Sequence, residues 1–305
     1  MDVVSRYPCV RAARRFDPAR HLPFVIAGVR AGWIRRSDLP WLDAWREIFE
    51  IDDVQVGLHA GLDTVEARSR ALGEVIEALA ADGRIRGWRN ETYAIRNRFD
   101  AAPLALIERA ASRFFGTQTY AVHLNGVVGT HAMWIARRSP NKATDPGMLD
   151  NLVGGGIGWG YGIDETLVKE CWEESGLPAA LARRAVRGGT IHVLQEIDEG
   201  TQAEQLFIYD LDVGADFVPR NQDGEVADHR LASIDTVLDW LADGAMTVDA
   251  SLAALDWMAR HGALDAAERT ALATLGAPPA IAEPASEGEA GLAGRPADLT
   301  PGAAR

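Results

Sequence analysis

Three glutamates at helical spacing follow a glycine-rich segment, and they form the part of the sequence best suited to chemistry. The stretch GGGIGWGYGIDETLVKECWEESGL spans residues 154–177 and contains Glu170, Glu173 and Glu174. At 100° per residue, these three side chains fall within about 100° of arc on one helix face. The apolar residues of the same segment lie on the other face, where they can anchor the helix. The pattern therefore predicts a packed helix from which three carboxylates project together.

This placement of Glu170, Glu173 and Glu174 is unfavourable for helix stability alone. Like charges three or four residues apart cost roughly 0.2–0.5 kcal/mol per pair, and the helix C-terminus disfavours negative charge. A divalent cation reverses the sign, because clustered carboxylate oxygens are the ligands that Mg²⁺ prefers, with water and phosphates completing the shell. The alternative is a solvated acidic face. The glycine segment at a fixed distance favours a metal site.

Lysine is rare in this chain, and its two positions are informative. Of the 31 basic residues, only Lys142 and Lys169 are lysines. A lysine is a flexible point charge, whereas an arginine is a planar fork, so each lysine marks a position with its own requirement. Lys142 and Arg137 precede the glycine segment, where they can hold phosphate; loop solvation is the alternative. Tyr161 lies within the segment, and its ring either stacks on a heteroaromatic ligand or packs the loop.

Alternating strand and helix patterns after Thr119 must position these residues. The Asn125-Gly126 dipeptide predicts a hairpin turn between two strands. Helices are predicted at 164–176, 233–242, 247–261 and 264–275, and further strands at 190–196, 204–211 and 226–232. After Gly276 the composition turns to Ala, Pro, Gly and Glu, which predicts a disordered tail over 277–305.

The first 118 residues differ in charge and pattern from the rest. They carry 18 Arg and 16 Asp or Glu, a balance of +2, within a chain whose net charge is −13. We expect a separate α+β module over residues 1–118. Its predicted elements are a pair of short strands, or a strand and a turn, at 22–35, helices at 41–49, 64–82 and 103–115, and a strand at 85–95. Thr64 is the expected cap of the second helix, and Gly83 and Gly116 are the expected stops.

The stretch from Gly155 to Gly176 resembles the Nudix box, G-x5-E-x7-R-E-U-x-E-E-x-G-U, where U is aliphatic. Two positions depart from it: Tyr161 stands at the first Glu, and Lys169 replaces the Arg. The resemblance extends beyond the box to a subfamily in which an extra N-terminal domain precedes the Nudix domain. In some yeasts this pair is fused to thiamine pyrophosphokinase. The segments that carry the wider resemblance are 108–116, 119–126, 137–151, 165–170 and 221–226.

This resemblance implies a fold and a reaction. The implied fold is an α/β/α Nudix sandwich with a mixed sheet over residues 119–235, followed by C-terminal helices over 236–276. The implied reaction is Mg²⁺- or Mn²⁺-dependent cleavage of a small organic diphosphate, with oxidised (damaged) thiamine diphosphate converted to the monophosphate.

The resemblance also implies roles for single residues. Glu173 and Glu174 bind metal together with the Gly155 carbonyl, and Glu170 binds metal or deprotonates the attacking water. Glu225 is a candidate for a further acidic ligand from a later loop; a plain turn position beside Gly224 is the alternative.

Two other functions stay open: hydrolysis of a nucleoside diphosphate derivative, and non-catalytic binding of a phosphorylated ligand. The net charge of −13 weighs against nucleic-acid binding. No apolar run approaches the roughly 18 residues of a membrane span, and no apolar signal segment opens the chain. With two cysteines far apart, we expect a cytoplasmic protein. The N-terminal module is expected to close the pocket or to mediate contacts in a homodimer.

Overall fold

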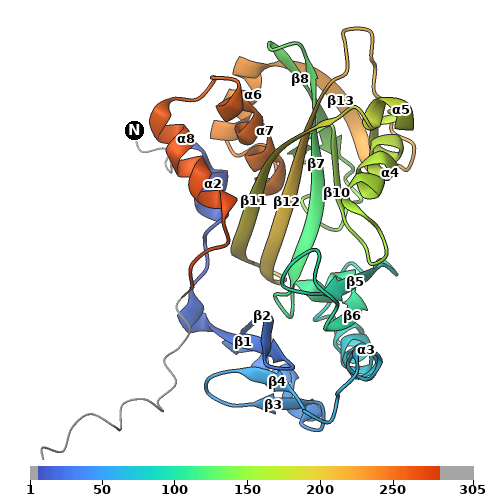
Figure 1. Cartoon of the computed structure of the whole chain (residues 1–305), viewed down its shortest axis with the longest axis vertical. Helices are drawn as coiled ribbons and strands as arrows, with labels where there is room; N and C mark the ends of the chain where they lie inside the picture. The colour runs from blue at the N-terminus through green and yellow to red at the C-terminus, as the bar shows by residue number, and fades with distance from the viewer. Residues whose placement is uncertain (1–5, 282–305) are drawn as a thin grey trace, which may run out of the picture.

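The computed structural model describes residues 6–281, which form two packed units (Figure 1). The smaller unit contains a four-stranded sheet in the order β2-β1-β4-β3 and a separate β5–β6 pair. Its elements are β1 (His21–Ile26), β2 (Val29–Arg35), β3 (Phe49–Ile51), β4 (Val56–Leu58), α3 (Val65–Ala81), β5 (Thr92–Ile95) and β6 (Ala105–Glu108).

Helix α3 forms where its pattern predicts it. The Thr64 side chain accepts a hydrogen bond from the Ala67 N–H, and the helix ends just before Gly83, whose φ is +70°. Its apolar face is buried against the sheet and the β5–β6 pair. The predicted cap and the predicted stop are both confirmed.

Two other N-terminal predictions are wrong, and a third is confirmed only in part. The segment 41–49 contains only short 3₁₀ turns before β3, and Pro40 lies inside the first of them. The segment 103–115 forms β6 and a 3₁₀ turn, because alternate residues Ala105 and Ile107 are buried while the strand pairs with β5. Tertiary packing thus overrides the helical propensity of this segment. The predicted strand 85–95 is confirmed only over β5.

The larger unit is an α/β/α sandwich around a seven-stranded mixed sheet. The strand order is β11-β12-β7-β8-β13, with β10 paired to β7 and β9 to β8; β12 and β7 are parallel. Its strands are β7 (Gln118–Val128), β8 (Ala132–Arg138), β9 (Leu149–Asp150), β10 (Val153–Gly156), β11 (Val186–Ile197), β12 (Gly200–Asp212) and β13 (Val226–Ser233). Its helices are α4 (Ile163–Ser175), α5 (Ala179–Ala182), α6 (Ile234–Ala242), α7 (Val248–Arg260) and α8 (Ala266–Ala273). The sandwich agrees with the predicted fold class.

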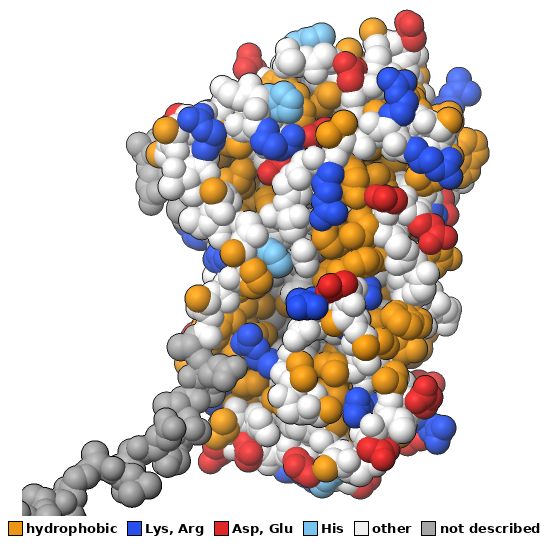
Figure 2. Space-filling view, viewed as in Figure 1, with side chains coloured by type: hydrophobic (Ala, Val, Ile, Leu, Met, Phe, Trp, Pro, Cys, Tyr) orange, Lys and Arg blue, Asp and Glu red, His pale blue; other side chains and the backbone are white. Residues whose placement is uncertain are grey.

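Separate apolar cores lie on the two faces of this sheet. Leu167 and Cys171 of α4 pack on one face, whereas α6 and α7 pack on the other. The short helix α2 (Pro8–Ala12) also packs against α7, so the start of the chain joins this core and not that of the N-terminal module. Figure 2 shows hydrophobic side chains in the middle of the face seen between α4 and the C-terminal helices.

The predicted turn at Asn125-Gly126 is wrong, because β7 continues through both residues. The Asn125 side chain is fully buried and donates to the Ala253 carbonyl at 2.9 Å. Gly126 makes room for Leu152: a Cβ at this glycine would lie 2.2 Å from the leucine Cδ2. The chain turns instead after β7, at Gly129, whose φ is +58°.

The predicted disordered tail and the predicted absence of a membrane span are compared with the structure in turn. Of the predicted tail 277–305, residues 282–305 lie outside the described part. Among residues 6–281, no helix is long and apolar enough to cross a bilayer.

Candidate functional site

Helix α4 and strand β10 hold the predicted acids. The helix begins after Gly162, whose N–H bonds to the Glu165 carboxylate at 3.5 Å, and it ends at Gly176 in the left-handed conformation, with φ +68°. The apolar side of α4 packs on the sheet beside β10. This orientation brings Glu170 and Glu174 against the glycines of β10.

Gly155 provides the space that Glu170 occupies. A Cβ at position 155 would lie 2.3 Å from the Glu170 carboxyl carbon, so no larger residue fits without moving the acid. The Glu170 side chain is 15% exposed. Burial raises the pKa of Glu170, while the Lys169 ammonium acts in the opposite direction. The absence of a side chain at Gly155 of β10 therefore lets the Glu170 side chain of α4 pack directly against the strand.

Glu174 is the most buried of the three acids. Its carboxylate accepts a hydrogen bond from the Gly154 N–H at 2.8 Å and lies 3.3 Å from Lys142 Nζ. The pKa of Glu174 is raised to about 8, chiefly by burial, with Lys142 acting to lower it and Asp150 to raise it. This carboxylate is thus held between the β10 backbone and a lysine, with little access to water.

Each of the two lysines bridges two predicted acids. Lys169 Nζ lies 3.1 Å from Glu170 and 2.6 Å from Glu173. Lys142 Nζ lies 3.3 Å from Glu174 and 2.5 Å from Glu225. The structure therefore brings Glu225 to the site, where Lys142 lowers its pKa against the effect of burial.

In this arrangement the acids are not positioned to coordinate a metal ion together. Within residues 6–281, no group of three or more His, Cys, Asp or Glu side chains is placed to hold a metal ion. The lysines occupy the space between the carboxylates of each pair. The donors still fit a hard divalent cation in kind, since carboxylate oxygens and the Gly155 carbonyl are its preferred ligands. Lys169 is 43% exposed on a flexible stem, so it can move away from Glu170 and Glu173.

Two predicted binding residues, Arg137 and Tyr161, make no hydrogen bond or ion pair with the predicted acids within residues 6–281. Arg137 donates to the Gly147 carbonyl at 2.9 Å and pairs with Asp228 at 3.4 Å. Its strand neighbour Arg138 pairs instead with Asp150 at 2.7 Å, because adjacent strand residues face opposite sides of the sheet. Tyr161 is 47% exposed, and only its main-chain N–H makes a hydrogen bond in the described part of the chain. The structure thus does not bring Arg137 into the site.

The N-terminal module supplies residues that sequence reasoning missed. Arg89 lies 3.3 Å from the Glu225 carboxylate, and Tyr93 packs its hydroxyl against Gly156, where a Cβ would be only 1.9 Å away. The Thr92 carbonyl accepts a hydrogen bond from the Trp159 N–H at 2.7 Å. The run WRNETY at 88–93 combines cationic and aromatic residues, but its pattern indicated only a strand.

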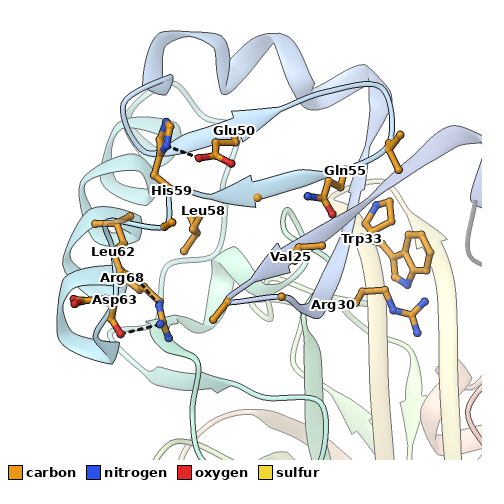
Figure 3. A pocket seen from close by; sticks show the side chains of 16 residues that line it. Val25, Arg30, Trp33, Glu50, Gln55, Leu58, His59, Leu62, Asp63 and Arg68 are labelled. Carbon is orange, nitrogen blue, oxygen red and sulfur yellow. Dashed lines mark hydrogen bonds and ion pairs between the residues drawn. The ribbon is translucent and has the colours of Figure 1, made fainter. Parts of the chain in front are cut away.

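A cavity in the N-terminal module lies away from these acids. Figure 3 shows this cavity of about 720 Å³, which is lined by residues from 23–68 on the outer side of the four-stranded sheet. Its polar groups bond mainly to one another or to the backbone: Glu50 pairs with His59 at 2.7 Å, and Arg68 donates to the Leu62 carbonyl. No acid of α4 reaches it. This cavity is therefore not part of the site formed by the α4 acids.

Two family models match the chain. "Domain of unknown function (DUF4743)" matches residues 5–119, and "NUDIX domain" matches residues 119–254. Nudix hydrolase 24, chloroplastic, of Arabidopsis thaliana is 39% identical over 247 residues, covering 79% of this chain and 68% of its own. Nudix hydrolase 20, chloroplastic, of the same plant is 37% identical over 254 residues, with the same coverage of 79% and 68%. The uncharacterized protein YJR142W of Saccharomyces cerevisiae is 29% identical over 240 residues, covering 72% of this chain and 70% of its own.

Proposed function

Because the chain belongs to the Nudix hydrolase family, with a DUF4743 domain before its Nudix domain, we propose that oxidised thiamine diphosphate is its preferred substrate. The chain is a Nudix pyrophosphohydrolase, and its class of substrate is a small organic diphosphate. In the proposed reaction, water adds to one phosphorus and the bond between the two phosphates breaks. The products are the thiamine monophosphate derivative and inorganic phosphate.

The observation that carries the site assignment is the packing of Glu170 against Gly155, with Glu174 bonded to the Gly154 N–H. In our proposal Glu170, Glu173, Glu174 and the Gly155 carbonyl hold Mg²⁺ or Mn²⁺. Such an ion supplies neutralisation of phosphoryl charge and acidification of a bound water. Glu170 accepts the proton of the attacking water at its carboxylate.

The lysines have distinct roles in this proposal. Lys142 is 9% exposed and fixes the carboxylates of Glu174 and Glu225 in one orientation. Lys169 compensates the charges of Glu170 and Glu173, and its exposed, flexible stem would let it move away from them if a divalent cation bound there. Lys169 thus places, at the Arg position of the Nudix box, a flexible side chain that can move away from the two carboxylates.

Two features support a thiamine substrate: segments outside the box, and two aromatic side chains within it. The segments 137–151 and 221–226 resemble the subfamily associated with thiamine diphosphate, and they supply Lys142 and Glu225 to the site. Two aromatic side chains before α4, Trp159 at 41% and Tyr161 at 47% exposure, offer faces on which a heteroaromatic ring can stack.

Incubation of the protein with Mg²⁺ or Mn²⁺ and a panel of organic diphosphates tests the proposal. The panel contains oxidised thiamine diphosphates, intact thiamine diphosphate and nucleoside diphosphate derivatives, and products are identified by mass. We expect oxidised thiamine diphosphates to give the highest kcat/KM, with the monophosphate as product. A higher kcat/KM for a nucleoside diphosphate derivative would replace the thiamine proposal with the nucleoside one.

A further inference from the structure

A second cavity, of about 460 Å³, lies between the N-terminal module and the Nudix domain. The Nudix domain lines it with the loop at 143–144 and the turn at 198–199. The N-terminal module contributes six arginines to the lining. These are Arg35, Arg84, Arg86, Arg89, Arg109 and Arg113. The acids among its lining residues are Asp38, Asp198 and Glu199.

Some of these arginines already have carboxylate partners. The pairs are Arg35–Asp38 at 2.7 Å, Arg109–Glu91 at 2.8 Å, Arg89–Glu225 at 3.3 Å and Arg113–Glu199 at 4.0 Å. Arg84 and Arg86 have no carboxylate partner within residues 6–281. The Arg84 guanidinium lies on the Trp41 ring, 3.4 Å from its centroid, and Arg86 donates only to the Gly83 carbonyl. Two cations at this cavity thus remain available to an anion.

The arginine cavity adjoins the acids of the catalytic site. Arg89 lines the cavity and contacts Glu225, which shares Lys142 with the buried Glu174. Ala143 lines it directly after Lys142. Gly87, with φ +74°, approaches this alanine so closely that a Cβ on the glycine would lie 3.2 Å from the alanine Cβ. The arginine-bearing loop of the N-terminal module is therefore packed against the lysine-bearing loop of the Nudix domain.

Gathering like charges in one cavity is unfavourable unless an anion offsets them. The whole chain has a net charge of −13, yet six arginines and only three acids line this cavity. Four of these arginines already have carboxylate partners, so the excess positive charge lies on Arg84 and Arg86. An excess of positive charge in a cleft attracts anions. Guanidinium groups match phosphate oxygens in geometry and bind them through strong charge-assisted hydrogen bonds. The cavity thus has the chemistry of a phosphate-binding site.

We propose that the arginine cavity binds the phosphate groups of the substrate, with Arg84 and Arg86 as the principal contacts. This inference rests on the proposed diphosphate hydrolysis and assigns a part of that site to the N-terminal module. The module holds the terminal phosphate while the α4 acids act at the adjoining bond. Substrate binding then depends on both units of the chain.

Calorimetric titration with inorganic pyrophosphate in the presence of EDTA tests binding without turnover. We compare the wild-type full chain with Arg84→Ala/Arg86→Ala. Arg30→Ala is the matched control, because Arg30 is also an exposed arginine stacked on a tryptophan, with its guanidinium 4.8 Å from the Trp33 ring, but it lines the other cavity. We expect the double variant to raise the Kd about tenfold or more and the control to leave it unchanged. Equal affinity in the double variant, or no binding by the wild type, would overturn the inference.

Steady-state kinetics separate this inference from the proposed function. With a substrate that the wild type turns over, the double variant is expected to raise KM about tenfold and to change kcat less than twofold. Turnover with an unchanged KM in the double variant contradicts the inference and leaves the hydrolase function intact. Arginine-dependent pyrophosphate binding without turnover of any diphosphate supports the inference and contradicts the proposed function. Circular dichroism melting confirms that the compared variants are folded.

Discussion

The ammonium of Lys142 lies 3.3 Å from a carboxylate oxygen of Glu174, and both side chains are almost fully buried. Removal of the lysine leaves the buried acid without its cationic partner, whereas removal of the acid leaves Lys142 paired with Glu225. The second lysine, Lys169, forms a similar bridge at the surface, where water screens it. This difference in burial gives the two lysines different expected effects on stability.

Replacement of each lysine by methionine measures this difference. Lys142→Met is expected to lower the free energy of unfolding by about 3 kcal/mol at pH 8, because Glu174 and Glu225 then repel each other near the protein interior. Lys169→Met, the matched exposed variant, is expected to cost less than about 1 kcal/mol. Urea unfolding of both variants checks the prediction. Equal losses would show that burial of Lys142 does not determine its contribution.

Glu174→Gln is expected to abolish turnover while the fold is kept. The amide retains an acceptor oxygen for the Gly154 N–H, so the contact between α4 and β10 survives. The negative charge that we propose to hold the cation is lost, and we expect kcat to fall by roughly 10²-fold or more. Product assays and thermal melting of the same preparation measure both quantities. Activity near the wild-type level in a folded variant would remove Glu174 from the catalytic site.

Gly155→Ala tests the contact between β10 and Glu170. The new methyl group would lie 2.3 Å from the Glu170 carboxyl carbon, so the acid must move and turnover is expected to fall at least tenfold. Gly73→Ala on α3 is the matched control, because nothing lies within 4 Å of the position that its methyl group would take. We expect that control to keep full activity and to gain up to about 1 kcal/mol of stability. Kinetics and unfolding are measured on both; an active Gly155→Ala enzyme would show that Glu170 need not stay in place.

The stability of the fold is expected to depend on pH through Asp249. Burial raises the pKa of Asp249 to about 8, Glu204 raises it further, and the Gln202 hydrogen bond lowers it. Because the folded pKa exceeds the unfolded value of about 3.9, the native state binds the extra proton. Its contribution to stability is therefore complete below pH about 4 and is lost as the pH rises to about 8.

Asp249→Asn removes this dependence. The stability of the variant relative to the wild type is expected to increase by on the order of 2 kcal/mol between pH 5 and pH 8. Urea unfolding at several pH values across this range provides the measurement. Parallel stability curves for the two proteins would show that Asp249 is already ionised in the native state.

Local patterns sufficed to predict the elements whose signals lie within a single segment. Helix α3 has a cap, a periodic apolar face and a glycine stop in sequence, and helix α4 has the same periodicity and a final glycine. The prediction of a turn at Asn125-Gly126 is wrong because the glycine serves another purpose. Gly126 makes room for the side chain of Leu152, and this contact cannot be predicted from local turn propensity. The predicted helix at 103–115 is wrong for a similar reason, since β6 forms there by pairing with β5, a separate segment of the chain.

The candidate site was predictable to a similar extent. Spacing alone placed Glu170, Glu173 and Glu174 on one helix, and the rarity of lysine singled out Lys142 and Lys169. The pairing of each lysine with two acids, however, joins residues up to 83 positions apart, as in Lys142 and Glu225. The ion pair between Arg89 and Glu225 links the two domains, and no local sequence pattern around Arg89 predicts it. Contacts of this kind follow from the assembled fold and not from any single motif.

Binding of Mn²⁺ to the α4 acids is the most direct test of the account. Titration of free Mn²⁺ by electron paramagnetic resonance compares the wild type with Glu170→Gln/Glu173→Gln. The matched control is Glu74→Gln/Glu77→Gln, which removes two acids at the same spacing on α3. The wild type and the control are expected to bind Mn²⁺, and the α4 variant is expected to lose this binding. Equal Mn²⁺ binding by all three proteins, or none by the wild type, would contradict this expectation.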